Sequence, residues 1–210
     1  MASPVRRLPR RRSGSPSGAS AGQRAGGTGR AVKSPVLSTG PLRLRALGRR
    51  DRRFYARIYA DLALMSRVGP PLDRRAGLRS ADALLASMHG PAPRAHCWTI
   101  LLGPARRRIG LVGWRVQAAD IELGAMLLPA WQGQGWAVAA LRRVCAELIE
   151  NQGAPRLLMR YRPGHEAAAS VCRRLRFTER PELTDEAGRR VWTLSAQAWR
   201  GATSSADEVS

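Results

Sequence analysis

Apolar and polar residues alternate over residues 41–47, the first regular pattern along the chain. Leu42 and Leu44 alternate there with Arg43 and Arg45, and Ala46 and Leu47 follow. This period is that of a strand with one buried face, so we predict the first strand here. From Asp51 to Leu64 the apolar residues recur every three or four positions, which predicts a helix. A second helix is expected to begin at Ser80 or Asp82.

Strands dominate the middle of the chain. The apolar runs at residues 97–102 and 109–114 flank a turn-rich segment and predict a hairpin, and residues 120–127 extend it into an antiparallel meander. Apolar residues from Trp136 to about Asn151 then repeat every three or four positions and form the clearest helical pattern. The remaining expected elements are a buried strand at 157–161, a helix at 166–174, and closing strands near 177 and at 191–194.

The two ends of the chain lack this periodicity. Residues 1–40 are rich in Arg, Ser, Gly and Pro and contain almost no large apolar residue, so we expect a disordered basic tail. The composition is compatible with a solvated tail, a translation start placed too far upstream, a targeting segment or an RNA-binding segment. We place a single domain at 41–200 and a disordered C-terminal tail at 201–210.

The formal charge of +21 suggests a nucleic-acid partner, because basic surfaces attract phosphate backbones. Only one basic residue, Lys33, is a lysine, so the arginine content reads partly as a coding bias. A large part of the charge also precedes Asp51, the first acidic residue. Nucleic acid is therefore an optional partner through the tail and is not required.

Composition and spacing argue against several other classes of site. No apolar run approaches the roughly eighteen residues of a membrane-spanning helix, so no membrane association is expected. The cysteines Cys97, Cys145 and Cys172 are far apart and form no CxxC pair, which predicts no disulfide framework and fits a cytoplasmic location. The histidines show no metal-ligand spacing, so no metal is predicted.

Candidate chemistry lies between the meander and the long helix, where a strand leads through Pro129 into a glycine-rich turn. Unpaired backbone N–H groups and the helix dipole attract anions to a helix start, and glycines let a phosphate approach the backbone. The chain has neither the Gly-Lys-Ser/Thr of a nucleotide P-loop nor a full GxGxxG in a parallel βαβ unit. An ordinary glycine turn is the competing interpretation of a bare GxG. The flanking sequence is needed to distinguish it from a phosphate-binding turn.

With its flanking elements, Gln132-Gly133-Gln134-Gly135-Trp136-Ala137 resembles the acyl-CoA motif of GNAT N-acetyltransferases, Gln/Arg-x-x-Gly-x-Gly/Ala. The resemblance is to the branch that includes ribosomal-protein alanine N-acetyltransferases (RimJ/RimL-like), and it runs from Leu42 to about Trp199. It implies a GNAT fold of the α/β (α+β) class, with a mixed, mostly antiparallel central sheet of about six to seven strands and about four helices. It also implies acetyl-CoA as the acyl donor.

The resemblance assigns roles on both sides of the motif. In the family the pantetheine arm enters between two splayed strands, and a backbone N–H group of the first polarises the thioester carbonyl. That strand is residues 121–127 here. His165 stands where relatives often carry an asparagine and is a candidate contact to the coenzyme arm. The other expected coenzyme contacts are the backbone of Ala125, Met126 and Leu127, and the motif residues Gln132, Gly133, Gln134, Gly135, Trp136 and Ala137.

Two residues are candidates for proton transfer. Glu122 is a candidate general base, because it and Asp120 are the only carboxylates on the strand beside the expected acyl position. A solvated surface carboxylate is the competing interpretation. Cys172 stands where some relatives place a tyrosine acid, and a thiol can donate a proton to the departing CoA thiolate. A small core residue is the alternative for Cys172, and Tyr161 is a weaker candidate acid.

These residues predict an enzyme that transfers acetyl from acetyl-CoA to a primary amine by direct attack. The acceptor would be a protein or peptide N-terminus or a small-molecule amine, and the arginine excess after residue 50 favours an acidic or RNA-associated one. The segment from Met65 to Arg79 is expected to shape its pocket. The alternative is a noncatalytic acyl-CoA-binding or RNA- or ribosome-associated module. We expect a monomer or a homodimer.

Overall fold

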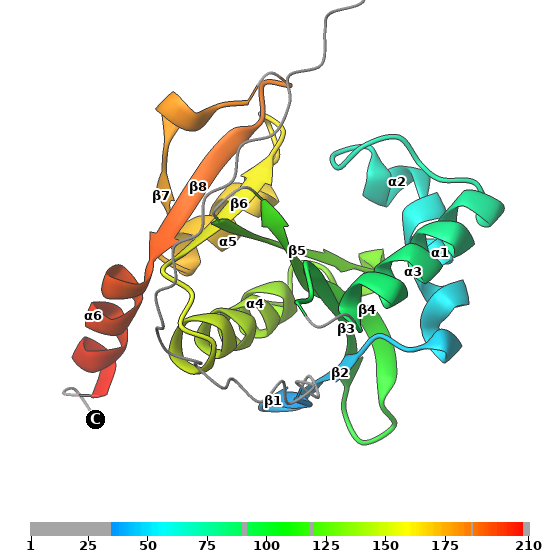
Figure 1. Ribbon diagram of the computed structural model, residues 1–210, viewed down its shortest axis with the longest axis horizontal. Helices are drawn as coiled ribbons and strands as arrows, with labels where there is room; N and C mark the ends of the chain where they lie inside the picture. The colour runs from blue at the N-terminus through cyan, green and yellow to red at the C-terminus, as the bar shows by residue number, and fades with distance from the viewer. Residues whose placement is uncertain (1–34, 90–91, 118–119, 186, 208–210) are drawn as a thin grey trace, which may run out of the picture. The chain divides into compact units, whose positions relative to one another are not determined.

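A computed structural model describes residues 35–89, 92–117, 120–185 and 187–207. These residues form one eight-stranded sheet and six α-helices (Figure 1). The strands are β1 Leu37–Thr39, β2 Leu42–Ala46, β3 Ala95–Leu102, β4 Arg107–Gln117, β5 Asp120–Leu127, β6 Arg156–Tyr161, β7 Thr178–Glu179 and β8 Arg190–Ser195. The α-helices are α1 Arg52–Ala60, α2 Leu62–Met65, α3 Arg74–Met88, α4 Trp136–Ala146, α5 Glu166–Arg174 and α6 Ala196–Asp207.

The sheet is mixed and mostly antiparallel, as the sequence predicts. Its order is β1-β2-β3-β4-β5-β6-β8-β7, and among the described strands only β5 and β6 pair in parallel. The predicted count of strands and helices is too low. The missed elements include β1 with three residues and α2 with four, which are too short to show a period.

Two hydrophobic clusters lie on opposite faces of the sheet. Neighbouring β3 residues divide between them, because successive strand side chains point to opposite faces. Trp98 packs in the cluster that includes Leu141 of α4, whereas Cys97 packs with Ile58 of α1. Figure 1 accordingly shows α4 on one side of β1–β5 and α1–α3 on the other. Burial on both faces explains why β3 reads as a nearly continuous apolar run.

The helix boundaries differ from the prediction where a polar residue caps a new start. The first predicted helix is divided at Asp61, whose extended backbone ends α1 and whose Oδ1 accepts from the Leu64 N–H group (3.0 Å) to cap α2. The second helix begins at Arg74, earlier than expected. Asp73 caps it, with Oδ1 accepting from the Ala76 N–H group (2.7 Å), and its first turn is too polar to show an apolar period. The long helix follows the prediction, with α4 continuing as a π-helical turn through Asn151.

Regular structure extends beyond both predicted domain boundaries. Strand β1 precedes residue 41, and the Trp98 indole N–H group donates to the Pro35 carbonyl (3.3 Å). At the other end α6 continues past residue 200, and Trp199 Nε1 donates to Glu150 Oε1 (2.7 Å). The prediction for residues 1–34 lies outside the described residues. No helix in the described part of the chain is long and apolar enough to cross a membrane.

Candidate active site

The glycine turn joins the end of β5 to the start of α4. A short 3₁₀ turn, Pro129–Trp131, comes first, and Gly135 is the N-cap residue of α4. Gly133 and Gly135 have φ values of +74° and +83°, in the left-handed region that favours glycine. A Cβ atom at either position would meet no atom within 4 Å. The space beside both glycines is therefore open to a ligand.

Side chains of the turn brace the turn itself. The Gln132 amide donates to the Leu127 carbonyl (2.9 Å), and the Gln134 amide donates to the Ala130 carbonyl (3.0 Å). Trp136 Nε1 donates in turn to Gln134 Oε1 (3.0 Å). The backbone N–H groups of residues 133–138 have no hydrogen-bond partner among the described residues. These N–H groups and the dipole of α4 are available to an anion.

Strands β5 and β6 separate immediately beside this turn. They pair only at Ile121 with Leu157 and at Glu122 with Leu158, so β5 from Leu123 onward has no strand on its β6 side. The strand separation expected from the family resemblance is therefore present.

The register of β4 and β5 fixes which N–H groups face the gap. The Leu128 N–H group donates to the Ile109 carbonyl (2.9 Å), which marks this pair as hydrogen-bonded. Hydrogen-bonded pairs alternate along antiparallel strands, so Met126 bonds to Leu111 of β4. The N–H groups of Ala125 and Leu127 consequently point away from β4 toward the gap. Of the three predicted backbone contacts, the structure orients these two for a ligand and not Met126.

A cavity of about 350 Å³ lies where the turn, the gap and α5 meet, and we call it the motif cavity. It gathers nearly all of the predicted coenzyme contacts, although Gln134 does not line it. The lining includes Ala125, Met126, Leu127, Gln132, Gly133, Gly135, Trp136, Ala137 and His165.

A second cavity of about 530 Å³ adjoins the first, and we call it the arginine cavity. It extends between β4, β5, β6 and the helices α1 and α3. The two cavities share six lining residues, which are Val68, Ala125, Met126, Met159, His165 and Ala168. A ligand in one cavity can therefore meet a ligand in the other at the end of β5.

Comparison with known proteins agrees with this geometry. Residues 41–178 match the family described as acetyltransferase (GNAT) domain. The chain belongs to the GNAT acetyltransferase family. The acetyltransferase activity and acyl-CoA donor expected from the sequence are those of this family. A search of curated proteins gives no match.

Solved structures share the fold of this acetyltransferase. An acetyltransferase from Agrobacterium tumefaciens is 26% identical, with a TM-score of 0.68 over 76% of this chain and 94% of that one. RimL, a ribosomal L7/L12 alpha-N-protein acetyltransferase in complex with coenzyme A, is 14% identical, with a TM-score of 0.66 over 78% and 99%. The ribosomal-protein-S5-alanine acetyltransferase from Vibrio fischeri is 14% identical, with a TM-score of 0.64 over 79% and 98%.

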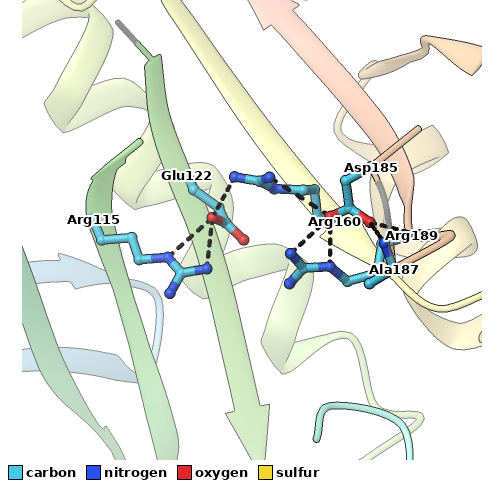
Figure 2. Close-up of polar contacts among 6 residues, drawn as sticks. All are labelled: Arg115, Glu122, Arg160, Asp185, Ala187 and Arg189. Atoms are coloured by element: carbon cyan, nitrogen blue, oxygen red, sulfur yellow. Dashed lines mark hydrogen bonds and ion pairs between the residues drawn. The ribbon is translucent and has the colours of Figure 1, made fainter. Parts of the chain in front are cut away.

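Glu122, the candidate base, lines only the arginine cavity and takes part in an ion-pair chain (Figure 2). Its Oε2 atom accepts from Arg115 Nε and from Arg160 Nη2, both at 3.0 Å. Arg160 continues the chain to Asp185 (3.7 Å), which also pairs with Arg189 (2.7 Å). Glu122 thus ties β4 to β6 across β5, just where β5 and β6 begin to separate.

Cys172 lies in the core of the acetyltransferase and lines neither cavity. It is fully buried, and its Sγ atom contacts Met159 Sδ (3.9 Å). Burial raises the pKa of its thiol to about 12. The core interpretation of Cys172 therefore fits this position, and an acid for the departing thiolate does not. Tyr161 is also buried but does line the arginine cavity, and burial raises its pKa.

His165 lies between the two cavities at the start of α5. Burial and the neighbouring positive charge of Arg67 lower its pKa from the usual 6.5. Its Nδ1 atom is buried and has no hydrogen-bond partner among the described residues. The imidazole is therefore neutral at pH 7, and the described residues leave the hydrogen-bonding capacity of Nδ1 unused.

Sequence reasoning missed several residues of the arginine cavity. Arg160 reaches Glu122 from a strand 38 positions away in sequence. Arg67 and Arg162 lie outside regular elements and carry no motif, although Arg67 belongs to the segment predicted to shape the acceptor pocket. Among the described residues no group of three His, Cys, Asp or Glu side chains could hold a metal ion.

Proposed function

We propose that this acetyltransferase moves the acetyl group of acetyl-CoA directly onto a primary amine. The contact between the two cavities supports the proposal most strongly, because it lets donor and acceptor meet without a covalent enzyme intermediate. The motif cavity takes the acetyl-CoA, with its pyrophosphate on the free N–H groups at the start of α4. The amine enters through the arginine cavity. A protein or peptide N-terminus and a small-molecule amine are both acceptors of the required kind.

The reaction forms one bond and breaks one. The amine nitrogen bonds to the acetyl carbon, the carbon–sulfur bond breaks, and the CoA thiolate leaves and takes up a proton from water. Negative charge develops on the thioester oxygen during attack. The N–H groups of Ala125 or Leu127 stabilise it, because fixed donors act more strongly on the developing charge than on the ground state.

We propose that His165 accepts the proton that the attacking amine loses. The imidazole is neutral at pH 7 and lies where the cavities join, so it can accept a proton there. Glu122 is held by two guanidinium groups through one oxygen, and protonation would weaken both ion pairs. We therefore assign Glu122 a positioning role in place of the base role expected from the sequence.

The experiment that tests this function follows free thiol during incubation with acetyl-CoA and a library of peptides and small amines. We expect thiol release that depends on the acceptor, and mass spectrometry should find the acetyl group on the amine. The protein contributes no background signal, because Cys97, Cys145 and Cys172 are all buried. Tight binding of CoA with no acceptor-dependent release across the library would favour the noncatalytic alternative, which the basic composition motivates.

Gly135→Asp and Gly135→Asn test the pyrophosphate site as a matched pair. Asn and Asp have the same shape and both tolerate a left-handed backbone, so the strain is shared and only the charge differs. We expect Gly135→Asp to bind acetyl-CoA about 30-fold more weakly than Gly135→Asn, since a carboxylate repels the phosphates at the helix start. Calorimetric titration measures both affinities. Equal affinities would place the pyrophosphate elsewhere.

A further inference from the structure

The arginine cavity has an excess of positive charge along its lining. Five arginines line it, namely Arg67, Arg115, Arg160, Arg162 and Arg189, whereas Glu122 is the one carboxylate among its lining residues. Its two histidines add little charge at pH 7. Burial lowers the pKa of His96 to about 4, and that of His165 also lies below its usual value.

Three of these arginines are already paired with carboxylates (Figure 2). Arg115 and Arg160 contact Glu122, and Arg160 and Arg189 contact Asp185. The pKa of Asp185 lies below its usual range, chiefly because the Arg189 backbone N–H group donates a hydrogen bond to its carboxylate. Burial raises this pKa by less, and a hydrogen bond from the Arg189 side chain lowers it further. This ion-pair chain thus contains three guanidinium groups and two carboxylates. Its carboxylates cannot offset the charge of the other arginines in the cavity.

The other two arginines have no carboxylate partner among the described residues. Arg67 Nη1 donates to the Gly164 carbonyl (3.0 Å), which places this guanidinium beside His165. Arg162 follows the end of β6 and is exposed. Both line the arginine cavity, and the Arg162 carbonyl accepts from the N–H group of His165 (3.3 Å), a residue that the two cavities share. An amine that reaches the junction therefore has two unpaired positive charges near it.

We propose that the acceptor carries a carboxylate within a few bonds of its amine, and that Arg67 and Arg162 bind this carboxylate. The inference rests on the proposed function and names its substrate class. Guanidinium groups bind carboxylates with charge-assisted hydrogen bonds. A polycationic acceptor is disfavoured, because Glu122 is already paired with two arginines. A peptide with acidic residues directly after its N-terminus and a small acidic amino compound share this chemistry.

The test compares acceptors that differ only in charge. Peptides that begin Ala-Glu-Glu, Ala-Gln-Gln and Ala-Lys-Lys, together with free glutamate and its amide glutamine, are assayed by acetyl-CoA-dependent thiol release at low and high salt. We expect kcat/KM for the acidic member of the productive series to exceed that of the neutral member by about 10-fold at low salt, and the ratio to fall as salt rises. Activity on the peptides identifies a peptide N-terminus as the acceptor, and activity on glutamate alone identifies a small molecule.

Variants locate the effect. Arg67→Gln and Arg162→Gln should each lower the acidic-to-neutral ratio about threefold, and the double variant should bring it close to one. Arg75→Gln, an exposed arginine that lines neither cavity, should leave the ratio unchanged. Equal rates for acidic and neutral acceptors in the wild-type protein, or a preference for Ala-Lys-Lys, would overturn the inference while leaving amine acetylation in place. No thiol release with any amine would overturn the proposed function itself.

Discussion

His165→Asn is expected to lower kcat about 100-fold while changing the KM for acetyl-CoA little. Asparagine is the residue that relatives often carry here, and it keeps a donor and an acceptor for the coenzyme arm. The asparagine side chain cannot take up a proton near neutral pH. The variant therefore loses general-base catalysis of proton transfer, which lowers kcat. Steady-state kinetics with a reactive amine separates the two parameters. A variant that raised KM for acetyl-CoA and kept kcat would instead make His165 a coenzyme ligand only.

The pH profile gives a second readout for the same variant. The pKa of His165 lies below 6.5, so its neutral form, which accepts the proton, is present above that pKa and lost as pH falls through it. The wild-type rate should therefore show an acidic limb below pH 6.5, besides any limb from protonation of the amine. His165→Asn should lose this limb. His89→Asn, an exposed histidine that lines neither cavity, is the matched control and should keep it.

Gly110→Ala is expected to destabilise the protein by about 3 kcal/mol. Gly110 lies in β4 opposite Leu127, and a Cβ atom there would come within 2.3 Å of the Met126 carbonyl oxygen. Backbone is in the way rather than a flexible side chain, so β5 must move from β4 at the point where its N–H groups face the gap. Urea unfolding followed by circular dichroism measures the change.

Gly124→Ala is the control for Gly110→Ala. Gly124 lies in the adjacent strand, and a Cβ atom there would meet no atom within 4 Å, so unfolding free energy should change by less than about 1 kcal/mol. If both alanine variants were equally stable, the close approach of β4 and β5 at Gly110 would be incorrect, and with it the register that orients Ala125 and Leu127.

The sequence predicted best those elements whose burial repeats with a regular period. The alternating leucines of β2 are buried at Leu42 and Leu44, and the apolar stripe of α4 packs at Leu141 and Val144 as expected. The start of α3 was missed because its first turn carries two arginines, and the cap at Asp73 is a local hydrogen bond that no period reveals. Periodicity therefore finds buried faces and leaves polar helix ends undetermined.

The candidate site was predictable only in part, for a different physical reason. The glycine turn could be predicted from local sequence, since positive φ angles and unpaired N–H groups at a helix start depend on a few adjacent residues. Which N–H group faces the gap depends on strand register, which the motif does not contain. The ion-pair chain around Glu122 joins residues from β4, β5, β6 and the segment before β8, so only the folded chain brings them together.

Gln132 and Gln134 brace the glycine turn, where we propose that the pyrophosphate binds, through hydrogen bonds to Leu127 and Ala130. The turn thus has little conformational entropy left to lose when acetyl-CoA arrives, and more of the interaction energy is retained as affinity. Association is also faster where the turn that receives the ligand does not have to order first. Gln132, one of the residues that make the motif recognisable, therefore also helps to fix the shape of the turn.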